Sequence, residues 1–206
     1  MLKNYLFFNI YYLVLVEITP LMITAQPKKG HLLIAEPSII CDMSFNRSVI
    51  LLADHTQEGS IGFILNKPLK YTLKDLIETS SEFKIFNGGP VEQDNLYFIH
   101  KVPHLIPNSI EISKGIYWGG NFEVVLDLIE SHKITAADIR FFLGYSGWEP
   151  SQLKEELESN AWVVSKNVYK NDLIEKSCQT FWKEKMLELG GDYSIWSNAP
   201  ENPSYN

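Results

Sequence analysis

The feature that most constrains the fold is the run SVILLAD at residues 48–54. Aliphatic and β-branched residues follow one another there almost without a polar break, which is typical of a strand buried on both faces. Gly59-Ser60 then supplies a turn signal, and the run IGFIL at residues 61–65 returns as a second strand. The sequence therefore predicts a β-hairpin with at least one fully buried strand.

Further strands and helices are predicted along the whole chain. Strands are expected at residues 31–36, 96–100, 110–118 (as one or two strands around Gly115), 139–143 and 161–165. Helices are expected near 72–77 and at 122–130, 152–158 and about 178–189, with tight turns at 87–90 and 144–147. Several strands are joined by connections too short for crossovers, so the pattern favours an α+β fold over a doubly wound sheet.

The body of the chain reads as one domain with an acidic surface. The full chain has 206 residues, 45% of them hydrophobic, which is enough for a sizeable core, and no Gly/Ser-rich or Pro-rich stretch divides it. The net charge of −7 argues against a broad phosphate-binding face. We therefore expect no direct binding to nucleic acid.

The N-terminal segment differs from the rest of the chain. Its apolar run at residues 5–16 is shorter than the roughly 20 residues that a helix needs to span a bilayer, so no membrane span is expected. Two interpretations stay open: a poor signal peptide, or an upstream start with Met22 as the true initiator. Under either one, residues 1–27 form an extension and residues 28–206 the folded domain.

Neither the cysteines nor the histidines predict a metal site. Cys41 and Cys178 lack Cys-x-x-Cys spacing, and both are interpreted as free thiols. His100 and His104 have i, i+4 spacing, but Pro103 between them makes a shared helical face unfavourable. We expect neither a metal nor another cofactor.

Ser146 carries the one motif that suggests catalysis. It lies in Gly144-Tyr145-Ser146-Gly147-Trp148, between a predicted strand and a predicted helix, as a hydrolase nucleophile does. A nucleophile elbow needs glycine two residues after the serine, and here that residue is Trp148. A hydrolase using Ser146 with a histidine such as His55 is kept as an alternative, and no catalytic residue is assigned.

Six segments in order resemble one known family. They are GHLLIAEP from Gly30, FNRSVILLADH from Phe45, GFILNKP from Gly62, NGGPV from Asn87, FLGYSGWEPSQLKEE from Phe142 and LGGDYSIWSNAP from Leu189. In these segments the chain resembles the YqgE/AlgH family of uncharacterised bacterial proteins. The resemblance implies a cytoplasmic protein with a single compact domain, in which helices surround a branched, coiled and mainly antiparallel sheet. It implies no established enzymatic activity, and the transcriptional-regulator label of some members comes without a recognisable DNA-binding element.

A set of polar, aromatic and glycine residues has no evident packing role, and we expect it to form a binding surface. Its members are Arg47, His55, Asn66, Gly88, Gly89, Pro90, Tyr145, Trp148 and Gln152. Exposed aromatic rings beside amide groups suit a small ligand or a partner protein. The sequence thus favours a binding or regulatory module over an enzyme, with an unknown protein or small molecule as its partner.

Overall fold

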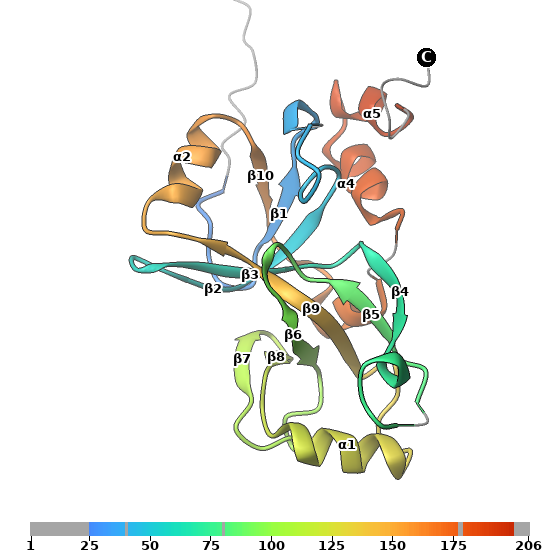
Figure 1. Ribbon diagram of the computed structural model, residues 1–206. Helices are drawn as coiled ribbons and strands as arrows, with labels where there is room; N and C mark the ends of the chain where they lie inside the picture. The colour runs from blue at the N-terminus through green and yellow to red at the C-terminus, as the bar shows by residue number, and fades with distance from the viewer. Residues whose placement is uncertain (1–24, 40, 80, 177–178, 200–206) are drawn as a thin grey trace, which may run out of the picture.

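The computed structural model describes residues 25–39, 41–79, 81–176 and 179–199 (Figure 1). The expected extension at 1–27 lies mostly outside these ranges, as does Cys178, whereas Ala25 packs against the core. Cys41 is exposed and free. Within the described ranges, no helix is both long and apolar enough to cross a membrane.

The described strands form one mainly antiparallel sheet. They are β1 (Leu32–Ala35), β2 (Val49–Thr56), β3 (Gly59–Ile64), β4 (Pro68–Thr72), β5 (Lys84–Asn87), β6 (Val91–His100), β7 (Ile110–Ser113), β8 (Ile116–Trp118), β9 (Ile139–Trp148) and β10 (Trp162–Ser165). The strand order is β10-β1-β2-β3-β9-β6-β8-β7, and β5 pairs with β4 and β9. The predicted β2–β3 hairpin is confirmed, and β2 is buried along its first five residues. The α+β class is confirmed as well.

The sheet branches at β9. The last three residues of β9 pair with β3, whereas residues 141–143 pair with β5 in parallel and with β6 in antiparallel orientation. The tight turn expected at 144–147 is therefore wrong, because β9 continues without interruption to Trp148. Gly144 has a positive φ of 68° inside this strand, where the chain at Gly88–Gly89 passes close to its backbone.

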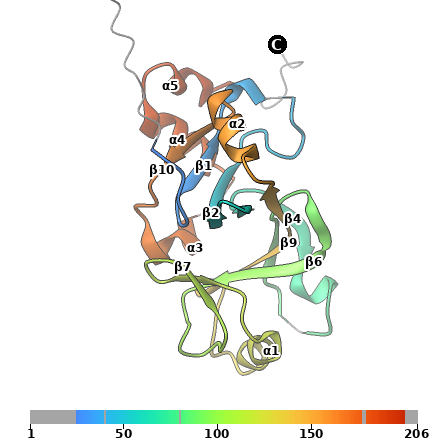
Figure 2. The ribbon, with the colours of Figure 1, turned by 90° about the vertical axis from the view of Figure 1, so that its left-hand side faces the viewer.

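The described helices lie outside the sheet, four of them at the two ends of the molecule and α3 beside the middle of the sheet. They are α1 (Phe122–Glu130), α2 (Gln152–Glu158), α3 (Leu173–Lys176), α4 (Phe181–Leu189) and α5 (Tyr193–Trp196). The bounds predicted for α1 and α2 are confirmed, but the helix expected near 72–77 is only a 3-10 turn at Leu73–Asp75. Figures 1 and 2 agree that α1 lies at one end of the molecule and α2, α4 and α5 at the other.

In the described part of the chain two hydrophobic clusters form the core, and β9 contributes to both. The larger cluster joins β1, β2, β3 and β10 to α4, and the smaller one joins β5, β6 and the start of β9 to α1. Phe142 belongs to the larger cluster and its neighbour Phe141 to the smaller, because successive residues of a strand point to opposite faces. This shared strand makes the two clusters one domain.

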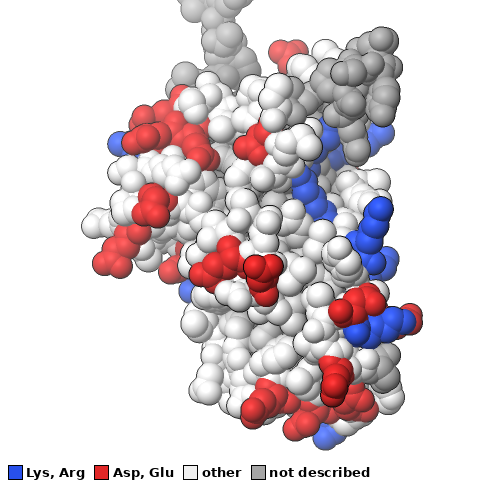
Figure 3. Space-filling view, viewed as in Figure 1, with Lys and Arg blue, Asp and Glu red and all other residues white. Residues whose placement is uncertain are grey.

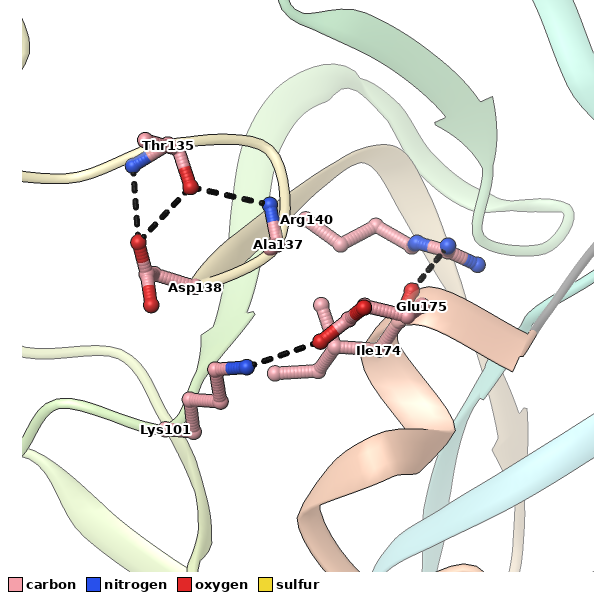
Figure 4. A network of polar contacts seen from close by, with 7 residues as sticks. All are labelled: Lys101, Thr135, Ala137, Asp138, Arg140, Ile174 and Glu175. Carbon is pink, nitrogen blue, oxygen red and sulfur yellow. Dashed lines mark hydrogen bonds and ion pairs between the residues drawn. The ribbon is translucent and has the colours of Figure 1, made fainter.

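A buried arginine fixes α3 to the middle of the sheet (Figure 4). Arg140 of β9 is 8% exposed, and its guanidinium donates hydrogen bonds to the carbonyl oxygens of Leu65 (3.1 Å) and Ile174. It also lies over the Phe86 ring, 4.3 Å from the ring centre. An ion pair of 2.9 Å between Lys101 and Glu175 adds a second link from the end of β6 to α3.

Candidate functional site

An open pocket of about 430 Å³ lies where the tip of the β2–β3 hairpin, the end of β9 and the start of α2 meet. It is lined by Asp54, Thr56, Glu58, Gly59, Ser60, Ile61, Val91, Tyr145, Gly147, Trp148, Glu149 and Gln152. Three of the predicted site residues, Tyr145, Trp148 and Gln152, are among them. We call this space the hairpin pocket. Figure 3 shows acidic side chains gathered over α2 and the hairpin tip on this face.

His55 lines a smaller pocket of about 250 Å³ beside the hairpin pocket. The two pockets share Thr56, Gly59, Ser60 and Glu149. His55 and Ser60 are paired across the hairpin, and the Nδ1 atom of His55 lies 2.7 Å from the Oγ atom of Ser60. A fourth predicted residue thus adjoins the same site.

A network of hydrogen bonds around Glu156 shapes the wall of the hairpin pocket. One carboxylate oxygen of Glu156 accepts from the indole N–H groups of Trp148 (2.8 Å) and Trp162 (2.7 Å). The other accepts from the Gln152 side-chain amide (2.9 Å), whose carbonyl oxygen accepts from the Glu149 N–H (3.0 Å). These bonds attach α2 to β9 and β10, so Trp148 and Gln152 are held in place before any ligand arrives.

Sequence reasoning missed Glu156, although a signal was present. Glu156 follows Gln152 by four residues on a predicted helix, a spacing that places two side chains on one face. Nothing in the sequence, however, indicates that the indoles of Trp148 and Trp162 converge on it. That convergence depends on β9 and β10, which are distant in the strand order.

Tyr145 forms an apolar part of the pocket with two strand neighbours. In the sheet Tyr145 pairs with Val91 and Gly147 pairs with Ile61, so these side chains share a face. The half-buried Tyr145 ring packs edge-on against Tyr97, with ring centres 5.6 Å apart. The pocket therefore has an aromatic and aliphatic floor.

Glu92 stands next to this floor with its carboxylate held in place. It follows Val91 directly and has a positive φ of 49°. Its carboxylate accepts hydrogen bonds from the Tyr97 hydroxyl and from Asn95 (2.7 Å), and these bonds lower the pKa of Glu92. The negative charge at this edge of the site is thus kept by hydrogen bonds.

The structure places Arg47 and Asn66 away from the pocket, in structural roles. Asn66 is 6% exposed; its Oδ1 accepts from the Val49 N–H (2.8 Å) and its Nδ2 donates to the Arg47 carbonyl (2.9 Å). These bonds hold Arg47 at a φ of 54°. The Arg47 guanidinium donates to the Ala199 carbonyl (2.7 Å) and lies 5.0 Å from the Trp182 ring centre.

Gly88 and Gly89 are also structural, and Pro90 after them is exposed. A Cβ atom built on Gly88 would lie 2.1 Å from the Gly144 carbonyl oxygen, and one on Gly89 would lie 2.3 Å from the Tyr145 carbonyl carbon. The glycines are needed because two backbones cross there without room for a side chain. The structure therefore does not bring Gly88, Gly89 or Pro90 into the pocket.

Ser146 has no access to a substrate. It is fully buried, and its Oγ donates to the Gly88 carbonyl oxygen at 3.0 Å. All five histidines lie in the described part of the chain, and none is hydrogen-bonded to it. The hydrolase alternative built on Ser146 and His55 is therefore not supported. Across the described residues, no group of three His, Cys, Asp or Glu side chains is placed to hold a metal ion.

Comparisons with known proteins agree on one family. A family model described as AlgH-like matches residues 32–194. The chain is similar to the UPF0301 protein BF2109 of Bacteroides fragilis, with 42% identity over 88% of this chain and 92% of the relative. It is also similar to a UPF0301 protein of Cytophaga hutchinsonii, with 38% identity over 86% of this chain and 98% of the relative.

The chain is also similar in fold to solved structures, among them the following two. The AlgH protein of Pseudomonas aeruginosa superposes with a TM-score of 0.66 and 25% identity, over 84% of this chain and 94% of that one. Protein DIP2367 of Corynebacterium diphtheriae superposes with a TM-score of 0.70 and 21% identity, over 86% of this chain and 95% of that one.

Proposed function

The chain belongs to the AlgH-like family of uncharacterised proteins, and on this basis we propose that it is a binding module whose site is the hairpin pocket. One observation carries the proposal. Tyr145, Trp148 and Gln152, three of the residues that the sequence predicts for a binding surface, line a single pocket, and His55 lines the adjoining one. Pockets with an apolar floor and a few convergent polar groups are the usual form of ligand sites.

Some of the pocket residues form its wall, and others are free to contact a ligand. The polar groups of Trp148 and Gln152 are already hydrogen-bonded to Glu156 and the Glu149 backbone, so these two residues give the wall its form. Tyr145 and the carboxylates around it are the groups available to an occupant, whereas the Thr56 hydroxyl accepts from the Glu58 N–H (3.1 Å) within the hairpin turn. A small molecule or one side chain of a partner protein matches the volume of about 430 Å³.

Direct regulation through DNA is the less supported alternative. The net charge is −7, and the face in Figure 3 that carries the pocket is rich in acidic side chains, which repel phosphate. A regulatory role of this protein would then act through a ligand or a protein partner. The cytoplasmic location expected from the sequence stays a prediction.

The proposal predicts that a bulky side chain at the pocket mouth weakens ligand binding. Amide chemical shifts of the ¹⁵N-labelled full chain are measured against a panel of small metabolites and short peptides, and we expect binders to shift the amides of residues 54–61 and 145–152. Thr56 is exposed at the hairpin tip, so Thr56→Trp places an indole at the pocket mouth and is expected to raise the Kd at least about tenfold.

Glu123→Trp is the matched control, because Glu123 is exposed on α1 at the opposite end of the molecule. It should leave the Kd unchanged. Binders that shift amides elsewhere, or that bind Thr56→Trp as well as the wild type, would show that the hairpin pocket is not the site.

A further inference from the structure

The hairpin pocket is lined by three carboxylates from two separate parts of the chain. Asp54 and Glu58 lie on the β2–β3 hairpin, and Glu149 follows the end of β9. Among the described residues that line it there is no lysine or arginine. The occupant of the pocket therefore meets a negative environment.

These three carboxylates are not neutralised by the protein, unlike other glutamates of the fold. Among the residues that the structure describes, five glutamates have a lysine within ion-pair distance: Glu82, Glu158, Glu175, Glu184 and Glu188. Within the described ranges, Asp54, Glu58 and Glu149 make no side-chain hydrogen bond or ion pair. Their charge is thus available to a ligand.

The apolar floor of the pocket favours an organic cation over a metal ion as the ligand. Ile61, Val91 and the Tyr145 ring offer apolar surface below the carboxylates. Calcium and magnesium need six or more oxygen ligands around one point, and no described cluster is arranged for that. An aliphatic stem would instead cover the apolar floor, while its charged end meets the carboxylates.

We propose that the hairpin pocket binds an organic cation, an ammonium or guanidinium group on an aliphatic stem. This inference rests on the proposed binding function and names the chemistry of the ligand. Tyr145, whose ring is fixed by its edge contact with Tyr97, also supplies a π face for the cation. The same chemistry is offered by a free amine and by a lysine or arginine side chain of a peptide.

The test uses matched charged and neutral probes with the full chain. Agmatine represents the free cation, acetyl-Gly-Arg-Gly-amide the peptide, and the same peptide with citrulline in place of arginine the neutral isostere. We expect agmatine, the arginine peptide or both to shift the amides of Ile61, Tyr145 and Gly147. The citrulline peptide should bind at least about tenfold more weakly, and 500 mM salt should weaken the charged probes because it screens exposed charges.

Charge-removing variants locate the cation. Glu58→Gln combined with Glu149→Gln keeps the side-chain size and is expected to raise the Kd of the binding cation about tenfold. Glu111→Gln combined with Glu123→Gln removes two exposed carboxylates elsewhere and should leave the Kd unchanged. Binding by only one of the two charged probes supports the inference and identifies the source as a free amine or a peptide.

Other outcomes would overturn the inference, and they separate it from the proposed function. If the citrulline peptide binds as tightly as the arginine peptide, or if only neutral or anionic ligands shift the pocket amides, the ligand is not a cation. The hairpin pocket would then remain the binding site. If Mg²⁺ displaces the organic cations from the pocket, the ligand is a metal ion. If no ligand of any class shifts the pocket amides, the inference and the proposed function both fail.

Discussion

Replacing Gly88 with alanine is expected to lower the free energy of unfolding by more than about 4 kcal/mol, or to prevent folding. A Cβ atom there would lie 2.1 Å from the Gly144 carbonyl oxygen and 3.0 Å from the Phe142 Cβ. Neither neighbour is the flexible end of a side chain, so the strands themselves must separate. Their separation would strain the bonds that Gly88 makes with Leu143 (2.9 Å) and Ile64 (3.0 Å).

Gly119→Ala is the matched control for this prediction. Gly119 has a positive φ of 66° but nothing within 4 Å of an added Cβ. Alanine there therefore lowers the free energy of unfolding only through backbone strain, by about 1 kcal/mol. Gly88 does not have a positive φ, so its substitution measures the close approach of the two backbones alone. Urea unfolding followed by circular dichroism compares the variants. If the free energy of unfolding of Gly88→Ala lies within about 1 kcal/mol of the wild-type value, the two backbones do not approach as closely at Gly88 as the structure shows.

The structural role of Gly88, Gly89 and Gly144 could not be predicted from the sequence. Glycine is suited both to a turn and to a close contact between backbones, and single-sequence patterns do not distinguish the two. The turn predicted at 144–147 was wrong for that reason, since the partners that demand Gly144 come from residues 88–93. Strand β5, at Lys84–Asn87, was missed because four residues carry too little periodicity, and its burial comes from pairing with β9.

The candidate site was predictable where its residues share an element. Tyr145 and Trp148 lie on one strand, Gln152 starts the next helix, and the hairpin beside them contributes His55. The carboxylates were missed, because acidic residues near a turn resemble an ordinary solvated surface. Only the pairing of β3 with β9 brings Glu58 and Glu149 around one pocket. The sequence predicts Arg47 and Asn66 in the binding surface because they are polar residues with no evident packing role, whereas the fold uses them to hold its backbone.

Through His100 the protein is expected to lose about 3 kcal/mol of stability as the pH falls from 7.5 to 4. The side chain is fully buried, its Nδ1 accepts from the Val102 N–H at 3.3 Å, and its ring stacks on Tyr117. Burial, partly offset by the Gly119 backbone, lowers the pKa of His100 from 6.5 to about 4. The folded protein therefore resists protonation that the unfolded chain accepts.

The direction of this change in stability with pH follows from proton uptake. Between pH 6.5 and 4 the unfolded state binds more protons at this histidine than the folded state, so stability rises with pH across that window. The contribution of neutral His100 is fully present above pH 6.5 and is lost as the pH falls toward 4.

The difference in stability between His100→Asn and the wild type isolates this effect from the carboxylates that titrate in the same pH range. His100→Asn keeps an acceptor for the Val102 N–H but carries no ionisable group, so its stability should fall less with acid than that of the wild type, by about 3 kcal/mol between pH 7.5 and 4. His104→Asn changes an exposed histidine and should follow the wild-type curve. Urea unfolding at a series of pH values measures all three proteins. If the curves of His100→Asn and the wild type stay parallel, the folded protein accommodates a charged His100, and the interior between β6 and β8 is open to water.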